Sequence, residues 1–233
     1  MNSPVKTAPA RRATGRRVRR AQLSDEVAGH LRTAIMAGTL RPGTFIRLDE
    51  TAAQLGVSIT PVREALLTLR GEGMVQLEPN RGYVVLPLSR NDIEDIFWLQ
   101  ATIAKELAAT AAERITDSEI DELDEMNNGL AAAVAGADPD QVAAAEFAFH
   151  RAFNRSAGRI KLAWFLLHAA RYTPTLVFVT DPDWGVSSVD RHRLLIDALR
   201  KRDIMAAVAH TEWEFTDGAR RLTERLDASG VWS

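Results

Sequence analysis

Short polar and basic side chains gather at the start of one expected helix, at residues 58–63. Apolar residues recur at helical spacing from Val62 to Leu69, which leaves Thr60 and Arg63 outside the apolar face. Backbone N–H groups at a helix start can bind a phosphate, and polar side chains there can hydrogen-bond the edges of bases. This pattern favours contact with nucleic acid.

A helix that enters the major groove needs a second helix to brace it across the DNA backbone. We expect that brace at residues 49–56, joined by a short turn to a helix at 61–70 that begins with a proline. An earlier helix is expected from Leu23, with Ser24 as a candidate N-cap, to near Gly38. Together the three helices predict a helix-turn-helix.

A β-hairpin is expected directly after these helices. Residues 74–79 and 82–87 have strand-like composition, and Asn80 and Arg81 lie in the turn between them. A hairpin with a polar tip is placed to reach the adjacent minor groove or the phosphates. Residues 21–88 therefore predict a winged helix-turn-helix domain.

The length of 233 residues fits two domains, and the charge is unevenly distributed along the chain. Residues 1–20 carry seven basic and no acidic side chains, residues 21–88 six basic and seven acidic, and residues 89–233 sixteen basic and twenty-four acidic. The first twenty residues lack apolar periodicity, so we expect a disordered basic arm. Its charge either attracts a polyanion or only solvates the chain.

After residue 88 the sequence turns to long, alanine-rich amphipathic stretches. Capping residues and Gly or Pro breaks predict helices at about 90–114, 117–135, 139–157, 159–179, 187–201 and 203–228. An all-α domain over residues 89–233 is therefore expected behind the winged helix. The fold class is mainly α.

Several function classes lack the residues that they need. The absence of cysteine excludes disulfides, iron–sulfur clusters and thiolate zinc sites. A helical metalloenzyme is the rival class, but the Glu-x-x-His and His-Glu-x-x-His patterns are absent, as are a P-loop and a serine elbow. No apolar run approaches a membrane span and none follows the basic N-terminus, so we expect a cytoplasmic protein, bound to the nucleoid when on DNA.

The stretch from GTLRPGT to NRGYVV, residues 38–85, resembles the DNA-binding domain of the GntR family of transcription regulators. The segment GVSITPVREAL and the turn PNRG carry the resemblance. It implies a double-stranded DNA operator as partner. It places Ser58, Thr60, Pro61 and Arg63, with Ile59 among them, at the start of the recognition helix, and Asn80, Arg81 and Gly82 in the wing. Arg32 and Arg47 are further candidate DNA contacts. The alternative for each arginine is an ordinary solvated surface charge.

One residue departs from the family pattern at the start of the recognition helix. The family often has an arginine between the serine and the threonine, where this chain has Ile59. An arginine could bind guanine with two hydrogen bonds, whereas isoleucine offers only apolar contact, for example to a thymine methyl group. We therefore expect an operator that differs from the commonest half-site of the family.

The all-α half resembles the FCD domain of the FadR-like branch, a helical bundle around a small-molecule pocket. Several such domains hold a divalent metal through Asp-x-x-x-His on one helix and two further histidines on later helices. The matching positions here are Glu146, His150, His192 and Glu214, so glutamate replaces both the aspartate and the third histidine. Residues four apart share a helix face, and this donor set suits Zn, Ni, Mn or Fe. The alternative is a metal-free polar pocket.

The expected effector pocket also departs from the family. An arginine usually lies near the stretch WLQATIAKEL, where this chain has Gln100 and Ala101. We therefore expect an organic metabolite that differs from the hydroxy acids and dicarboxylates sensed by many relatives. Other candidate pocket residues are Arg155, Arg171, Arg193 and His210.

The resemblance as a whole implies a ligand-responsive regulator, a repressor that binds a pseudo-palindromic operator as a homodimer. A purely architectural DNA binder without an effector is the alternative, and the size and polar interior residues of the second domain argue against it. Trp98, Trp164 and Trp213 lie on different expected helices. We expect them in the core rather than stacked on a ligand.

Overall fold

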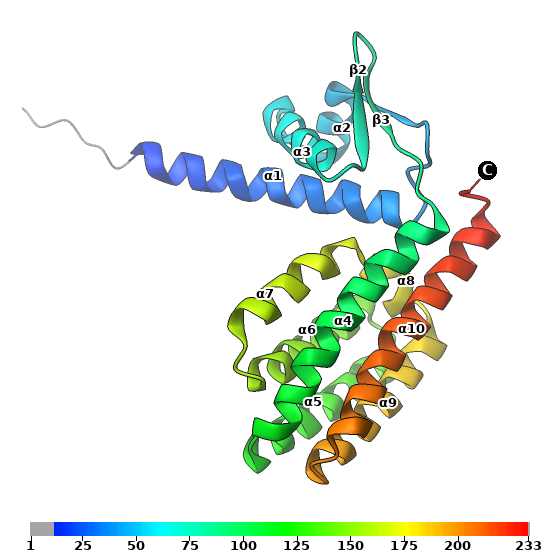
Figure 1. Ribbon diagram of the computed structural model, residues 1–233. Helices are drawn as coiled ribbons and strands as arrows, with labels where there is room; N and C mark the ends of the chain where they lie inside the picture. The colour runs from blue at the N-terminus through cyan, green and yellow to red at the C-terminus, as the bar shows by residue number, and fades with distance from the viewer. Residues whose placement is uncertain (1–11, 233) are drawn as a thin grey trace, which may run out of the picture. The chain divides into compact units, whose positions relative to one another are not determined.

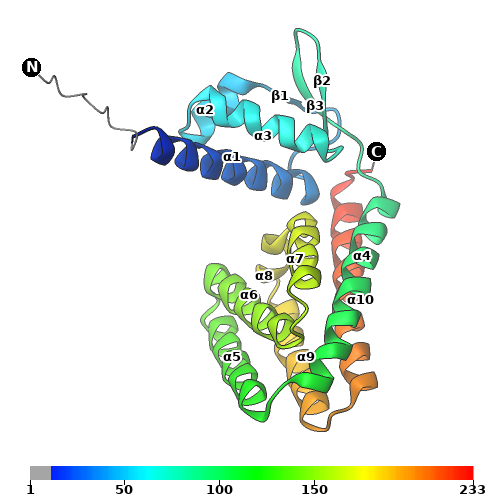
Figure 2. The same cartoon turned by 60° about the vertical axis from the view of Figure 1, so that its left-hand side comes forward.

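The computed structural model describes residues 12–232, which divide into two compact units. The first unit contains the described residues up to Ile35 together with Thr39–Pro87. The second contains Met36–Gly38 and the chain from Leu88 onwards. Figures 1 and 2 together label the α-helices and strands of both units.

The first unit is a winged helix-turn-helix. Its elements are α1 (Arg12–Met36), β1 (Phe45–Ile46), α2 (Leu48–Leu55), α3 (Ile59–Gly71), β2 (Val75–Glu78) and β3 (Gly82–Val85). The three strands form an antiparallel sheet in the order β1-β3-β2. The expected hairpin is therefore present, with β1 added to its edge.

Helix α3 has the amphipathic pattern that its sequence predicts. Val62, Ala65, Leu66 and Leu69 are fully buried in the core of the unit. The helix begins at Ile59, two residues earlier than predicted, behind Ser58 as N-cap. Its proline is thus the third residue of the helix, where the missing N–H still has no intrahelical partner to lose.

Helix α1 corrects the predicted extent of the basic arm. It begins at Arg12 instead of Leu23, so residues 12–20 are helical rather than disordered, whereas residues 1–11 lie outside the described part of the chain. Arginine and alanine both favour helix, and no proline interrupts residues 12–36. Ser24 is not an N-cap but a buried residue inside α1, where its hydroxyl donates a 2.6 Å hydrogen bond to Glu64.

The second unit is entirely helical in its described part. Its elements are α4 (Arg90–Arg114), α5 (Asp117–Gly136), α6 (Pro139–Ser156), α7 (Ile160–Ala169), the 3₁₀ turn η1 (Ala170–Tyr172), α8 (Thr175–Val179), α9 (Pro182–Arg200) and α10 (Ile204–Ser229). The long helices α4 and α10 run side by side in both ribbon views (Figures 1 and 2). They approach closely at Gly218, where a Cβ atom would lie 2.8 Å from the ring of Phe97.

Two helix boundaries in this unit differ from the sequence prediction. The single helix expected at 159–179 is broken into α7, η1 and α8, because Pro174 cannot continue a helix. Helix α9 begins at Pro182 rather than at residue 187. Asp181 caps it by accepting hydrogen bonds from the backbone of Asp183 and Trp184, and Pro182 then stands at a position that suits proline.

The core of the helical unit is built from aliphatic side chains and two phenylalanines, and tryptophans contribute little to it. Phe149 and Phe153 are its largest fully buried side chains, with leucines and isoleucines of α4, α5 and α9 around them. Trp98 is 68% exposed and Trp164 is 48% exposed. The prediction that these two tryptophans lie in the core is therefore wrong. No described helix has an apolar stretch long enough to cross a membrane.

Candidate DNA-binding surface and buried polar cluster

The first turn of α3 presents the side chains that the sequence assigns to DNA contact. Ser58, Ile59 and Arg63 are exposed, and Thr60 is half-buried beside them. The side chain of Ser58 accepts no hydrogen bond from the helix within the described chain. The first backbone N–H groups of α3 can therefore donate hydrogen bonds to a phosphate.

Pro61 does not belong to this exposed surface. It is buried at the third position of α3, facing the core with Val62. Because its side chain packs into the core, the structure gives Pro61 a packing role, and its contact with DNA stays a prediction. Its rigid ring fixes the backbone at the start of the helix.

Arg32, also predicted as a DNA contact, is engaged in an ion pair inside the unit. Its side chain lies on α1 with 6% exposure and forms a bidentate ion pair with Glu72, at 2.8 Å from Nε and 2.7 Å from Nη2. Such paired hydrogen bonds hold a guanidinium in one orientation. Arg32 therefore ties α1 to the end of α3.

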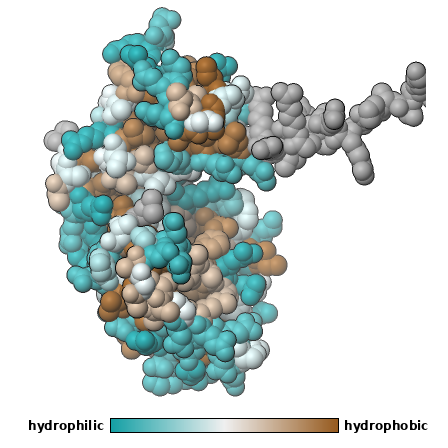
Figure 3. Space-filling model, turned by 180° about the vertical axis from the view of Figure 1, so that it is seen from behind, coloured by the Kyte–Doolittle hydropathy of each residue, from teal (hydrophilic) through white to brown (hydrophobic). Residues whose placement is uncertain are grey.

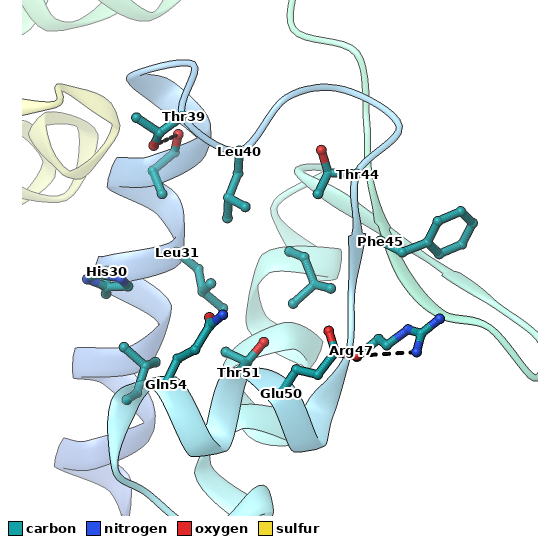
Figure 4. A pocket seen from close by; sticks show the side chains of 13 residues that line it. His30, Leu31, Thr39, Leu40, Thr44, Phe45, Arg47, Glu50, Thr51 and Gln54 are labelled. Atoms are coloured by element: carbon teal, nitrogen blue, oxygen red, sulfur yellow. Dashed lines mark hydrogen bonds and ion pairs between the residues drawn. The ribbon is translucent and has the colours of Figure 1, made fainter.

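Arg47 differs from Arg32 because its side chain is mostly exposed. It forms a 3.2 Å ion pair with Glu50 one helical turn ahead and leaves most of its surface in solvent. It stands at the edge of a hollow between α1, β1 and α2 that also contains His30 and Gln54 (Figure 4). This hollow contains neither Arg63 nor Arg81.

The tip of the hairpin is a tight turn from Glu78 to Arg81. The backbone N–H of Arg81 donates a 3.1 Å hydrogen bond to the carbonyl of Glu78, with Asn80 at φ +62°. A positive φ at this third position, after Pro79, is typical of a type II turn. Asn80 and Arg81 are exposed at the tip, and the guanidinium of Arg81 lies over the ring of Phe45.

A buried polar cluster lies within the helical unit, built from three helices. Glu146 and His150 share one face of α6, with Nε2 of His150 at 3.2 Å from Oε2 of Glu146. His192 of α9 places its Nε2 atom 3.7 Å from Glu146 and 3.6 Å from Glu214 of α10. All four residues predicted as metal ligands are thus brought together.

The cluster fits a metal better than a closed network of hydrogen bonds. Both ring nitrogens of His192 and Oε1 of Glu214 are buried without a hydrogen-bond partner in the described structure. Unpaired buried polar atoms are rare and costly. The ligand atoms of Glu146, His150 and His192 all lie within 4.8 Å of one another. Two imidazoles with carboxylate oxygens form a donor set for a divalent transition metal.

The surroundings shift the pKa values of the four groups. Burial raises the pKa of Glu214 to about 7 and lowers that of His192 to about 3, so His192 is a neutral imidazole. Burial would also raise the pKa of Glu146, but the hydrogen bonds from His150 and Ser188 and the charges of both histidines together outweigh it and lower this pKa. Burial works against protonation of His150, yet its hydrogen bond to Glu146 and the charges of Glu214 and Glu146 together raise its pKa to about 9.

Two features around the cluster were not found from the sequence. Ser188 donates a short hydrogen bond to Oε1 of Glu146 and so orients that carboxylate. Ser188 lies four residues before His192, so the helical spacing that pairs Glu146 with His150 could have revealed it. The ring of His192 stacks on Phe149, with centroids 3.7 Å apart and planes 11° apart, which no sequence pattern indicates.

The other predicted pocket residues are not all near the cluster. Gln100 is buried, but its side-chain amide donates to the carbonyl of Ala169 and accepts from the hydroxyl of Thr173. It therefore fastens α4 to the break after α7, which is a structural role. Within the described chain no ion pair joins an arginine to the cluster. The exposed predicted arginines are Arg155, Arg171 and Arg193, the last of which pairs with Asp190.

His210 lies on α10 one turn before Glu214 and is half-buried. Burial lowers its pKa, and the neighbouring charge of Arg191 lowers it further. The guanidinium of Arg191 stacks on Trp213, 3.7 Å from the ring centroid. Arg191 belongs to α9, and His210 and Trp213 belong to α10, two helices that pack against each other.

Both units match known protein families. Residues 23–85 match the family described as "Bacterial regulatory proteins, gntR family", and residues 95–212 match the FCD domain. The HTH-type transcriptional regulator McbR of Escherichia coli K12 is 26% identical over 191 residues, which cover 80% of this chain and 86% of that protein. The gluconate operon transcriptional repressor of Bacillus licheniformis is 25% identical over 225 residues, covering 91% and 92%.

A solved structure has the same fold. The structure titled "E. coli McbR/YncC" aligns with a TM-score of 0.66 at 22% identity, over 87% of this chain and 97% of that one. At this identity the likeness concerns the fold alone.

Proposed function

The chain belongs to the gntR family of bacterial regulatory proteins and carries an FCD domain, and on this premise we propose that it is a ligand-responsive transcriptional repressor. Two copies join through the helical unit and present two winged helices to a pseudo-palindromic operator. A small organic molecule bound in the helical unit changes the affinity of the dimer for DNA. The repressor acts in the bacterial cytoplasm, on the nucleoid.

The observation that carries the DNA-binding part is the first turn of α3. Ile59 and Arg63 are exposed there, while the opposite face of the same helix is fully buried. A helix held this way can insert its exposed N-terminal face into a major groove without loss of its packing. Arg63 has no ion-pair partner among the described residues, so its donors are available to a base or a phosphate.

The experiment for this proposal is selection of duplexes by the full-length chain from a library with a random central segment. We expect a two-fold symmetric consensus with half-sites one helical turn, or a multiple of it, apart. A footprint on that duplex should cover both half-sites. Enrichment of no sequence over the starting library would contradict the proposed operator binding.

The homodimer is supported by exposed apolar side chains on α4 and α7, two helices that pack against each other. These side chains are Trp98, Ile160, Trp164 and Phe165. Large exposed apolar patches on soluble proteins mark interaction sites. One recognition helix alone buries little surface on DNA, so a dimer also explains how specific binding is reached. Figure 3 shows that apolar residues also reach the surface in a view from behind.

The metal part of the proposal assigns one divalent ion, Zn, Ni, Mn or Fe, to the buried polar cluster. Glu146, His150, His192 and Glu214 would hold it, and Ser188 would orient Glu146 through its hydrogen bond. When bound, such an ion supplies a Lewis-acidic position to which an oxygen of the effector can attach. The unpaired atoms of His192 and Glu214 support this assignment.

The effector part of the proposal rests on polar residues of α9 and α10, where these two helices pack against each other. His210 and Arg191 lie beside the metal-ligand candidates and offer donors to an organic metabolite. A relative is named as the repressor of a gluconate operon, which supports a metabolite as the signal. A thermal-shift screen of metabolites on the full chain, followed by release assays on the selected duplex, identifies the effector.

A further inference from the structure

We infer that Phe45 is a positioning residue for the hairpin: its ring holds the guanidinium of Arg81 in the orientation in which Arg81 contacts DNA. The inference rests on the proposed function, because it takes the hairpin tip to be a DNA contact. The observation behind it is that Cζ of Arg81 lies 4.2 Å from the centroid of the Phe45 ring. At this distance the positive guanidinium is attracted by the negative face of the ring.

The backbone around the hairpin brings these two side chains together. Strand β1 pairs with β3, with Phe45 opposite Val84, so the ring lies at the edge of the hairpin. Gly82, the residue after Arg81, has φ +100°, and a Cβ atom there would lie 3.0 Å from the carbonyl oxygen of Ile46. Glycine at this position therefore allows β1 to lie close to the turn that carries Arg81.

The placement of Phe45 is not explained by the hydrophobic core. Successive strand residues point to opposite faces, and the next residue, Ile46, is the one that is buried. Phe45 remains half-buried and is one of the residues that line the hollow, but its ring points outward, away from Leu31 and Gln54 (Figure 4). Its described partner on that side is the guanidinium of Arg81.

Stacking leaves the hydrogen-bonding capacity of Arg81 intact. A guanidinium carries its five N–H donors in its plane, and the ring engages only its face. Arg32 and Arg47 of the same unit differ, because their guanidinium groups form ion pairs with Glu72 and Glu50. No ion pair of Arg81 is found within residues 12–232. The ring thus fixes the direction of the side chain without using the atoms that would contact DNA.

The expected benefit is preorganisation. Without the ring, Arg81 must be ordered from several rotamers when DNA binds, and this ordering weakens binding. A cation–π contact at an exposed site corresponds to about a two- to fivefold change in Kd.

The test uses the full-length chain and the duplex that wild type selects from a random library, at one fixed salt concentration. Phe45→Leu keeps apolar bulk on β1 but removes the ring, and Phe45→Tyr keeps the ring. We expect F45L to raise the Kd about two- to fivefold, F45Y to bind like wild type, and F45L to add nothing when Arg81 is already alanine. In NMR spectra, the side-chain protons of Arg81 should show an upfield ring-current shift that F45L abolishes.

The outcomes separate this inference from the proposed function. If R81A weakens binding but F45L binds like wild type, the hairpin contacts DNA and the positioning role of Phe45 is wrong. An equal loss from F45L in the R81A background would mean that the ring acts on something other than Arg81. If R81A itself binds like wild type, the expected contact between the hairpin tip and DNA is wrong, and the inference fails with it. Matching thermal midpoints for wild type and both Phe45 variants exclude misfolding as a cause.

Discussion

Replacement of Arg32 by alanine should destabilise the winged-helix unit rather than remove a DNA contact. Arg32 and Glu72 have side-chain exposures of 6% and 18% and share two hydrogen bonds of 2.7 and 2.8 Å. Removal of one partner from a buried pair leaves the other charge desolvated and costs up to about 3–5 kcal/mol. Because Glu72 keeps some contact with water, we expect about 2–3 kcal/mol.

The matched control is Arg47→Ala in the same unit. The pair of Arg47 and Glu50 has side-chain exposures of 64% and 61%, so its removal should cost no more than about 0.5 kcal/mol. For a unit of this size, 2–3 kcal/mol lowers the melting midpoint by roughly 10–20 °C. Calorimetry on the full chain without DNA should show this shift for R32A and almost none for R47A.

A second variant and a DNA titration complete this test. R32M/E72L replaces the pair with apolar groups of similar size, which is often neutral for stability, so its midpoint should lie well above that of R32A. At a temperature far below both midpoints, R32A should bind the selected duplex nearly as tightly as wild type. A midpoint like that of R47A, together with weakened DNA binding, would show that Arg32 is a DNA contact and that the ion pair contributes little.

Three further predictions concern the arm, the metal and the dimer. Replacement of the arginines at 12–20 by glutamine should make DNA binding less dependent on salt. The slope of log Kd against log salt concentration should fall by roughly one unit for each phosphate that these arginines neutralise. An unchanged slope in salt titrations would mean that the arginines only solvate the chain. His192→Ala should abolish stoichiometric Zn or Ni binding measured by calorimetry. In wild type the affinity for the metal should rise from pH 7 towards pH 9, because His150, with its pKa raised to about 9, must lose a proton to bind metal. A metal affinity independent of pH would contradict the role of His150 as a ligand. Trp98→Glu on α4 should shift the mass in light scattering from dimer to monomer. Met205→Glu, which changes an even more exposed apolar residue on α10, is the control.

Much of the DNA-binding unit could be predicted from the sequence because its signals are local. The apolar spacing of α3, the turn at Gly56 and the hairpin turn are set by residues near each other in the chain. Strand β1 was missed because two residues, Phe45 and Ile46, are too few to show periodicity. The partner of Arg32 could not be found either, since Glu72 is forty residues away and only the packing of α1 against α3 brings them together.

The helical unit shows the same division between local and long-range information. Caps such as Asp181 are local, but whether Pro182 ends a loop or begins a helix depends on hydrogen bonds that composition does not specify. The four polar residues of the cluster were named from a resemblance, and their distances required the packing of α6, α9 and α10. The exposure of Trp98 depends on which side of α4 remains uncovered, and the sequence of one chain does not show its partners.

The exposed start of α3 is the part of the molecule that we propose reads DNA sequence. Arg63 stands there, and Arg70, exposed at the last turn of the same helix, is the matched control. If Arg63 contacts a base, R63A should weaken binding to the selected duplex by about 1–3 kcal/mol and affect random DNA much less, while R70A changes neither. Ile59→Arg should shift the selected half-site towards guanine, because arginine can bind guanine with two hydrogen bonds.

The most direct measurement is therefore selection from one random duplex library by wild type, R63A, I59R and R70A, with Kd values on each selected duplex. We expect that R70A selects the wild-type consensus, that R63A loses preference at one position of each half-site, and that I59R gains a guanine. If R63A and I59R both select the wild-type consensus with unchanged affinity, α3 is not the recognition helix of this protein.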